Sequence, residues 1–237
     1  MKMMKLKIKL CLFLISILLV NCQHKEDKSQ KKHGVDKIPH QTANTHMHKT
    51  HFDTLTKNFE SPERKEWQKP EDIIALMGDI SSKTVNDIGA GTGYFSFLLL
   101  EKAKKVIASD VDERFIKYLE NRKIKATNPD IREKLEIRQI PYDRPLLQNE
   151  EVDIVLMVDV YHHIENRSHY FKKVKSGLKN GGKLMIVDFK KGDIPYGPPD
   201  KMKVSPEEVE EELKNAGFEK IEIDNKTLDF QYIIIAQ

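Results

Sequence analysis

The chain has 237 residues, a formal net charge of +3, 39% hydrophobic residues and 32% charged residues. This length allows one domain of ordinary size with extensions, and the composition allows a packed core. The charge balance gives no argument for a nucleic-acid partner. The two cysteines, Cys11 and Cys22, leave no cysteine nucleophile or cysteine metal site for the domain that follows them.

The first 22 residues have the features of an export leader. Four lysines precede an apolar run at 10–20, which is too short to span a bilayer as a helix and fits the central region of a signal peptide. The sequence Leu19-Val20-Asn21-Cys22 resembles a bacterial lipobox, with Asn21 in place of the usual Gly or Ala. The resemblance implies a diacylglyceryl anchor on Cys22, with an uncleaved membrane anchor as the alternative. Removal of the leader with its four lysines lowers the formal charge from +3 to about −1.

Residues 23–51 are polar, are rich in Lys, His, Gln and Thr, and show no apolar periodicity. They predict a flexible tether before a domain at 52–237. A transition metal could bind the histidines of the tether, but the lack of a second cluster with fixed spacing favours a solvated linker. These histidines are His24, His33, His40, His46 and His48, followed by His51.

The domain begins with a helical pattern over 52–80. The sequence Ser61-Pro62-Glu63-Arg64 predicts the start of one helix, and a second short helix follows Pro70 at 71–77. Trp67, between them, is the only tryptophan of the chain. It has two interpretations, a residue that covers a ligand cleft or an ordinary core residue.

The rest of the domain alternates strands and helices, which is the pattern of an α/β fold. Residues 152–158 are almost continuously apolar, as expected for a central parallel strand that is buried on both faces. Predicted strands occupy 84–88, 105–110, 134–140, 152–159, 183–189, 219–226 and 230–236, and predicted helices occupy 94–103, 113–122, 167–179 and 205–216.

A glycine-rich turn follows the first predicted strand. Gly89, Gly91 and Gly93 stand between the strand at 84–88 and the helix at 94–103. This arrangement is typical of the nucleotide-binding corner of an open α/β sheet, where glycines let a ligand lie against the backbone and the helix presents free N–H groups. Tyr94 stands where the dinucleotide fingerprint needs its third glycine, so the motif is G-x-G-x-G preceded by Asp87.

This motif resembles motif I of the class I S-adenosylmethionine-dependent methyltransferases. The resemblance implies a Rossmann-like, doubly wound, seven-stranded α/β sheet that is mostly parallel, with one antiparallel strand near the C-terminus. It also implies S-adenosylmethionine as cofactor, with the glycine loop against its methionine part and Asp110, at the end of the second strand, accepting both ribose hydroxyls. Asp143, after the third strand, takes the place of an acid near the adenine amine. The residues predicted to bind the cofactor are Asp87, Gly89, Ala90, Gly91, Gly93, Tyr94, Asp110, Asp143 and Asp159.

The segment after the fourth strand holds the predicted catalytic residues. In the family this segment faces both the methyl group and the acceptor, which implies roles for Asp159, Tyr161, His162 and His163. A histidine beside a carboxylate can act as a general base near neutral pH. The alternative is that the histidines cap the next helix or pack beneath the sheet. We expect no metal here, because adjacent histidines in a turn seldom aim at one ion.

Further segments extend the resemblance over about 51–237. A group of bacterial class I methyltransferases, many with an export leader, has similar sequences at Trp67-Gln-Lys-Pro70, Tyr161-His-His-Ile-Glu-Asn-Arg167, Asp188-Phe189 and Gly197-Pro-Pro199. Enzymes that methylate amino groups of nucleic acids have Asp/Asn-Pro-Pro-Tyr/Phe after the fourth strand, where this chain has Asp159-Val-Tyr-His. The lack of cysteines in the domain excludes cytosine C5 and arsenite methylation.

These features predict a methyltransferase that is anchored to the membrane through Cys22, with a small-molecule or lipid-associated acceptor and no nucleic-acid partner. The alternative is an exported lipoprotein that uses the scaffold as a non-catalytic binding module. The leader favours the periplasmic side of the cell envelope. Lysines on both sides of the apolar run leave the cytoplasmic face of the inner membrane as an alternative. The sequence gives no indication of the oligomeric state.

Overall fold

The structure is a computed structural model that describes residues 39–237, with side chains from Ala43 onward. The predicted signal peptide, the lipid anchor at Cys22 and the tether up to residue 38 lie outside the described residues and stay predictions. Within 39–237, no helix combines the length and the apolar character that a bilayer crossing needs.

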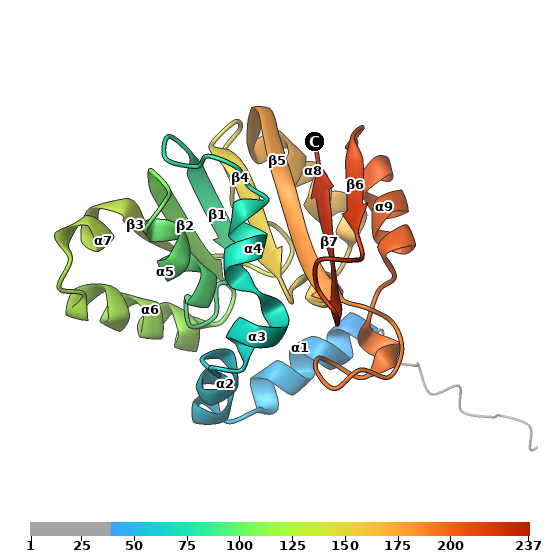
Figure 1. The fold of residues 1–237 in the computed structure, drawn as a ribbon, viewed down its shortest axis with the longest axis horizontal. Coiled ribbons are helices and arrows are strands. Elements are labelled where there is room, and N and C mark those ends of the chain that lie inside the picture. Colours follow the sequence, from blue (N-terminus) through green and yellow to red (C-terminus); the bar gives the residue numbers. More distant parts are fainter. Residues whose placement is uncertain (1–38) are drawn as a thin grey trace, which may run out of the picture. The chain divides into compact units, whose positions relative to one another are not determined.

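The domain is built on one seven-stranded sheet with the order β3-β2-β1-β4-β5-β7-β6 (Figure 1). The first five strands pair in parallel, and β7 runs antiparallel to both of its neighbours. The predicted mostly parallel sheet with one antiparallel strand near the C-terminus is therefore confirmed. The strands are β1 (Thr84–Ile88), β2 (Lys105–Asp110), β3 (Leu135–Gln139), β4 (Val152–Val158), β5 (Leu178–Phe189), β6 (Ile221–Asp224) and β7 (Gln231–Ala236).

Strand boundaries follow the prediction closely at the centre of the sheet and less closely at its C-terminal end. The bounds of β1 and β2 match the predicted ranges. Strand β5 begins at Leu178 instead of residue 183, because its first residues also pair with β4, across a register shift between Val152 and Ile154. Strand β6 is shorter than predicted, as is common for a strand at the edge of a sheet.

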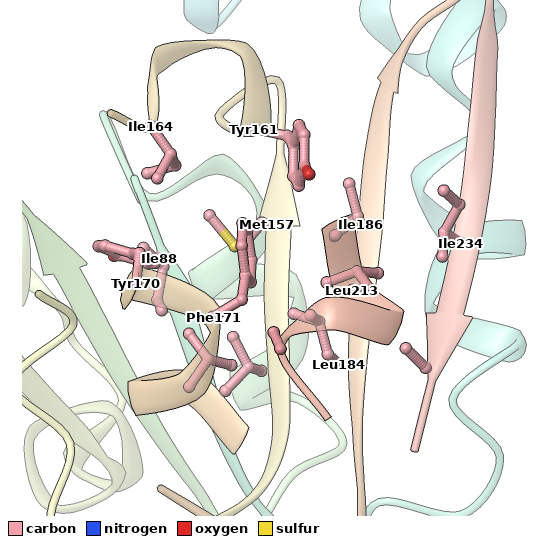
Figure 2. Packing of buried hydrophobic residues seen from close by; sticks show 14 of the residues in the cluster. Ile88, Met157, Tyr161, Ile164, Tyr170, Phe171, Leu184, Ile186, Leu213 and Ile234 are labelled. Atoms are coloured by element: carbon pink, nitrogen blue, oxygen red, sulfur yellow. The ribbon is translucent and has the colours of Figure 1, made fainter. Parts of the chain in front are cut away.

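Helices cover both faces of the sheet. Helices α4 (Pro70–Ala75), α5 (Tyr94–Leu100) and α6 (Glu113–Lys125) contribute to the apolar cluster on one face. Helices α8 (Arg167–Gly177) and α9 (Pro206–Asn215) contribute to the cluster on the other face, part of which Figure 2 shows. Successive residues of β4 alternate between the two clusters, so this strand is buried on both sides, as its apolar sequence predicts.

Three helices lie beyond the carboxyl ends of the parallel strands (Figure 1): α1 (Pro39–Lys49), α2 (Phe52–Phe59) and α3 (Arg64–Gln68). Between α3 and α4 the chain turns sharply at Lys69, whose φ is 46°, before Pro70 starts the next helix. Helix α1 corrects the prediction of a flexible tether up to residue 51, because it begins at Pro39. Its sequence lacks an apolar stripe. The buried Ala43 and the hydrogen bonds of Asn44 hold it on the domain instead.

One more helix was not predicted. Helix α7 (Pro129–Lys134) begins after Asn128, whose side chain accepts a hydrogen bond from the backbone N–H of Asp130, with proline at the first helical position. The predicted helix at 205–216 corresponds to α9, which begins with a capping box in which Ser205 and Glu208 bond each other's backbone N–H groups.

Candidate active site

A cleft with a volume of about 710 Å³ opens at the carboxyl ends of the central strands. The loop after β1 and the ends of β2, β4 and β5 form its base, while α1, α2, α3 and the loop at 190–204 form its walls. This is the place where open α/β sheets bind ligands, because the chain leaves the central strands in opposite directions there. Most of the predicted site residues lie in this cleft.

The glycine loop has the backbone geometry that the sequence predicts. Gly89, Gly91 and Gly93 all have positive φ, at 75°, 55° and 86°. A Cβ atom on Gly91 would lie 3.0 Å from the ring of Phe59 in α2, so the glycine also lets that wall of the cleft approach closely. Thr92 Oγ1 is buried beside this loop and has no hydrogen-bond partner among the described residues.

Asp87 and Asp110 sit at the ends of β1 and β2, as predicted, and both line the cleft. The Asp110 carboxylate accepts hydrogen bonds from the backbone N–H groups of Gly91 (2.8 Å) and Asp112 (2.9 Å), so it fixes the glycine loop. Asp87 accepts a bond from Ser96 Oγ at 2.6 Å. Burial raises the pKa of each carboxyl to about 6.

Asp159 is the third carboxyl group at the base of the cleft, is partly buried, and follows β4 with a φ of 61°. Its oxygens accept hydrogen bonds from the side-chain amides of Gln68 (3.0 Å) and Gln231, and Arg64 lies 4.0 Å away. Burial raises its pKa to about 6, although the nearby arginine opposes this shift. We refer to Asp87, Asp110 and Asp159 as the three cleft carboxylates.

Arg64 was missed by the sequence analysis as a site residue and organises one wall of the cleft. Its guanidinium donates to Gln68 Oε1 (2.8 and 2.5 Å) and to the carbonyl oxygen of Phe59 (2.6 Å). The same group lies over the ring of Tyr94, 4.3 Å from its centroid. Arg64 thus joins the end of α2, the helix α3 and the start of α5, and it places Tyr94 in the cleft as predicted.

His162 forms a buried pair with Asp188, at the ends of the adjacent strands β4 and β5. Its Nδ1 lies 2.9 Å and 3.0 Å from the two carboxylate oxygens of Asp188, and its backbone N–H donates to the same carboxylate at 3.1 Å. Burial disfavours the charged imidazole, but the carboxylate outweighs this effect and raises the pKa of His162. The side chain lines the cleft, so its orientation by Asp188 supports the predicted role of a base.

His163 also lines the cleft, in a different environment. Its Nδ1 lies 3.0 Å from Asn44 Oδ1 in α1, and Asn44 Nδ2 donates to its backbone carbonyl. Burial, together with the adjacent His162, lowers the pKa of His163 to about 3. This histidine therefore joins α1 to the domain and is neutral at physiological pH.

Three predicted site residues do not line the cleft. Tyr161 is fully buried in the core (Figure 2), where its ring stacks on Phe171. Its hydroxyl donates to Glu212, so the structure contradicts its catalytic role. Asp143 is exposed and pairs with Arg144, so it has no contact with the cleft. Gly93 starts α5 and serves the turn rather than the cleft surface.

The remaining walls are aromatic and apolar. Trp67 lines the cleft, which favours the first of its two predicted roles. Its ring is stacked on Tyr196, with centroids 4.7 Å apart and planes 13° apart, and it lies 6.1 Å from the ring of Phe189. Among residues 39–237 there is no group of three or more His, Cys, Asp or Glu side chains placed to hold a metal ion.

Comparison with known proteins gives consistent matches. The family model described as "Methyltransferase domain" matches residues 86–186. A probable S-adenosylmethionine-dependent methyltransferase of Mycolicibacterium smegmatis is 25% identical over 165 residues, covering 66% of this chain and 61% of that protein. A similar protein of Mycobacterium tuberculosis is 25% identical over 160 residues, covering 64% of this chain and 55% of its own. The chain thus spans less than two thirds of the length of these curated relatives.

Solved structures agree with the fold. The crystal structure of an S-adenosylmethionine-dependent methyltransferase from Aquifex aeolicus has a TM-score of 0.71 at 24% identity, covering 79% of this chain and 98% of that chain. A glycopeptide N-methyltransferase solved with S-adenosylmethionine has a TM-score of 0.58 at 16% identity, covering 71% of this chain and 86% of that chain.

The sheet order, the glycine loop and the acids at the strand ends define the architecture of a nucleotide-type cofactor site. The sequence and structural matches agree with this architecture. Residues 86–186 match a methyltransferase domain, and the fold is that of the class I S-adenosylmethionine-dependent methyltransferases, whose cofactor is S-adenosylmethionine, as predicted.

Proposed function

We propose that the protein transfers a methyl group from S-adenosylmethionine to a small acceptor molecule that binds in the same cleft. The buried His162–Asp188 pair carries this proposal, because His162 lines the same cleft as the glycine loop and Asp110. A non-catalytic binding module, the alternative from the sequence, has no need for a histidine that is oriented by a buried carboxylate.

The glycine loop and Asp110 would hold the cofactor. When it is bound, S-adenosylmethionine supplies a methyl group that is already activated on a positively charged sulfur. The three cleft carboxylates provide negative charge toward this cation. The remaining task of the protein is to align the acceptor with the methyl group and to exclude water.

His162 is suited to take a proton from the acceptor. Because Asp188 accepts the Nδ1 proton, Nε2 of the neutral ring is the atom that can act as a base. Asp188 raises the pKa of His162 above the ordinary pKa of histidine. The neutral imidazole therefore becomes the dominant form only at a pH above that raised pKa. His163 has its Nδ1 bonded to Asn44 and a strongly lowered pKa, so it is the weaker candidate.

The charge of the cleft favours a small acceptor over a nucleic acid. Arg64 is the only lysine or arginine among the described residues that line the cleft, and three of its five N–H donors are bonded within the protein. Nucleic-acid binding depends on several phosphate contacts from Lys and Arg. A volume of about 710 Å³ lies in the range of small-molecule sites, with room for the cofactor and a modest acceptor.

Calorimetric titration of S-adenosylmethionine and S-adenosylhomocysteine into the full chain tests the cofactor site. We expect binding on the order of micromolar, and at least roughly tenfold weaker binding by Asp110→Ala. Asp143→Ala is the matched control, because Asp143 was also predicted to bind the cofactor but lies outside the cleft. The absence of binding to folded protein, or an equal loss in both variants, would overturn the proposal.

We also propose that the protein is anchored through a lipid on Cys22, on the periplasmic side of the cell envelope. This proposal rests on the leader sequence alone. A reporter enzyme fused after residue 237 tests it. Activity of a reporter that works only in the periplasm supports export, whereas activity of a cytosolic reporter supports the cytoplasmic face of the inner membrane.

A further inference from the structure

We propose that the acceptor is a flat, uncharged ring compound that carries a hydroxyl group as the methylated site. The proposal rests on the proposed function and concerns one part of the cleft. We call this part the acceptor lobe and define it by Trp67, Phe189, Tyr196, Pro198, Met202 and His162, which line the cleft at the ends of β4 and β5.

The acceptor lobe has a wall of flat rings. Trp67 and Tyr196 are stacked on each other, and Phe230 supports Tyr196 from behind with a centroid distance of 5.3 Å. Phe189 is buried at the base, whereas Trp67 and Tyr196 are half-buried, so part of each ring stays open to the cleft. Aromatic faces of this kind prefer an offset-stacked or edge-on ring as their partner.

The backbone holds this wall in a fixed position. Gly197 has a φ of 92°, and a Cβ atom placed on it would lie 2.5 Å from the ring of Phe189. The loop therefore needs glycine to lie directly on that ring. Pro195, Pro198 and Pro199 flank this glycine region and restrict the backbone further, so Tyr196 is presented from a stiff loop.

The charged groups beside the lobe are partnered within the protein. Three of the five N–H donors of Arg64 are bonded to the carbonyl of Phe59 and to Gln68, and its Nη2 lies 4.0 Å from the Asp159 carboxylate. Asp159 also accepts hydrogen bonds from Gln68 and Gln231, so the two opposite charges balance each other before an acceptor binds. Burying an unpaired charge between these rings would be costly, and an uncharged acceptor avoids that cost.

His162 indicates a proton-bearing acceptor atom. In the proposed step the acceptor oxygen forms a bond to the methyl carbon, and the carbon–sulfur bond breaks with its electron pair left on sulfur. The hydroxyl proton passes to His162 Nε2, so the products are a methyl ether, S-adenosylhomocysteine and a protonated imidazole. An acceptor without a proton would leave the oriented base with no role.

Three compounds with the same bicyclic ring system test the class of the acceptor. 2-Naphthol is flat and uncharged, decahydro-2-naphthol carries an aliphatic hydroxyl at the same position but is not flat, and 2-naphthoate is flat but anionic. Each is titrated into the full chain saturated with S-adenosylhomocysteine, with calorimetry and the fluorescence of Trp67, the only tryptophan, as readouts. We expect 2-naphthol to bind roughly three- to tenfold more tightly than either analogue and to change the Trp67 emission.

Matched variants locate the binding. Tyr196→Leu removes a ring of the wall and should weaken 2-naphthol binding several-fold, whereas Tyr142→Leu removes a cleft ring outside the acceptor lobe and should not. Gly197→Ala, which pushes the loop off Phe189, should also weaken 2-naphthol binding. This second variant tests the lobe if Tyr196→Leu fails to fold. Equal binding of all three compounds, tighter binding of 2-naphthoate, or no effect of either lobe variant overturns the proposal.

The failure of this proposal is distinguishable from the failure of the proposed function. If S-adenosylhomocysteine binds and no ring compound does, the acceptor class is wrong while the cofactor site stands. If 2-naphthol binds at the lobe and S-adenosylhomocysteine does not bind, the methyltransferase function is wrong. Conversion of 2-naphthol to 2-methoxynaphthalene in the presence of S-adenosylmethionine would support both.

Discussion

Asp188→Asn is the most informative single change in this protein, because it keeps the shape of the side chain and removes its charge. Asp188 is fully buried and accepts hydrogen bonds from three donors, the backbone N–H groups of His162 (3.1 Å) and Phe189 (2.7 Å) and the Nδ1–H of His162. An amide oxygen can accept two of these bonds, while the NH₂ group turns a donor toward the third. We expect a loss of roughly 1–3 kcal/mol in the free energy of unfolding from this one unsatisfied donor.

The loss should depend on pH in a defined direction. The pKa of His162 is raised in the folded protein, so its charged form stabilises the fold below the unfolded value of about 6.5, and this contribution disappears as the pH rises through the raised pKa. Burial opposes ionisation of Asp188, but His162 outweighs it and lowers the pKa of Asp188, so that carboxylate is charged across the same range. Asp188→Asn should therefore lower the free energy of unfolding more at about pH 5.5 than at about pH 9.

Urea unfolding at both pH values measures this difference. Asp153→Asn is the matched control, because Asp153 bonds Thr84 N–H and Lys179 without any histidine, so its cost should be the same at both values. The pH–rate profile of the enzyme is the second readout, and its acidic limb, where His162 loses its proton, should move to lower pH in Asp188→Asn. A stability loss that does not change between the two pH values, or an unmoved profile, would refute the assignment of Asp188 as the residue that orients His162.

Three further results are expected. Tyr161→Phe removes the hydrogen bond to Glu212 and should lower the free energy of unfolding by roughly 0.5–1.5 kcal/mol while kcat stays unchanged. Denaturation and initial-rate assays measure the two quantities, and a large fall in kcat would restore the catalytic role of Tyr161. Arg64→Leu should weaken S-adenosylmethionine binding in calorimetry, because the carbonyl of Phe59 and the side chain of Gln68 lose their donor, and unchanged affinity would argue against its organising role. Affinity for S-adenosylmethionine should fall as the pH drops through about 6, where the three cleft carboxylates become protonated. The affinity for S-adenosylhomocysteine, whose sulfur carries no charge, should fall less over the same range, as calorimetry at several pH values can measure.

The sequence predicts best what depends on local pattern. Strand β1 and the glycine loop follow from a short apolar run and a fixed spacing of glycines, and Asp110 follows from its place at the end of the next strand. These features need no knowledge of distant contacts. The sheet topology was predictable for the same reason, because the alternation of strands and helices leaves few ways of connecting a doubly wound fold.

Residues that meet only through the fold were not predictable in this way. Gln231 reaches Asp159 because β7 inserts beside β5, and Arg64 reaches the same carboxylate from a helix far earlier in the chain. The pairing of His162 with Asp188 did leave a signal, since His162 follows β4 and Asp188 lies near the end of the adjacent parallel strand β5. Both segments are recognisable in the sequence, but only the strand order brings them together.

Tyr161 shows how a short turn reverses an expectation. Residues 161–163 form a single 3₁₀ turn, in which successive side chains point about 120° apart. His162 and His163 therefore face the cleft while Tyr161 points into the core, where Arg167 lies 4.9 Å from its ring centroid. Proximity in sequence to a catalytic segment was not enough to place this side chain in the site.

Helix α1 determines where the protein can be shortened for laboratory use. A version that starts at residue 52, the boundary the sequence suggests, would delete Asn44 and leave the His163 ring without its partner. It would also remove His48, which lies 2.5 Å from the Tyr142 hydroxyl across the cleft. Such a truncated protein would keep the sheet but lose one wall of the cleft. Any inactivity would then result from the truncation and would say nothing about the full chain. Versions that begin ahead of Pro39 keep this wall and are the appropriate material for acceptor screening.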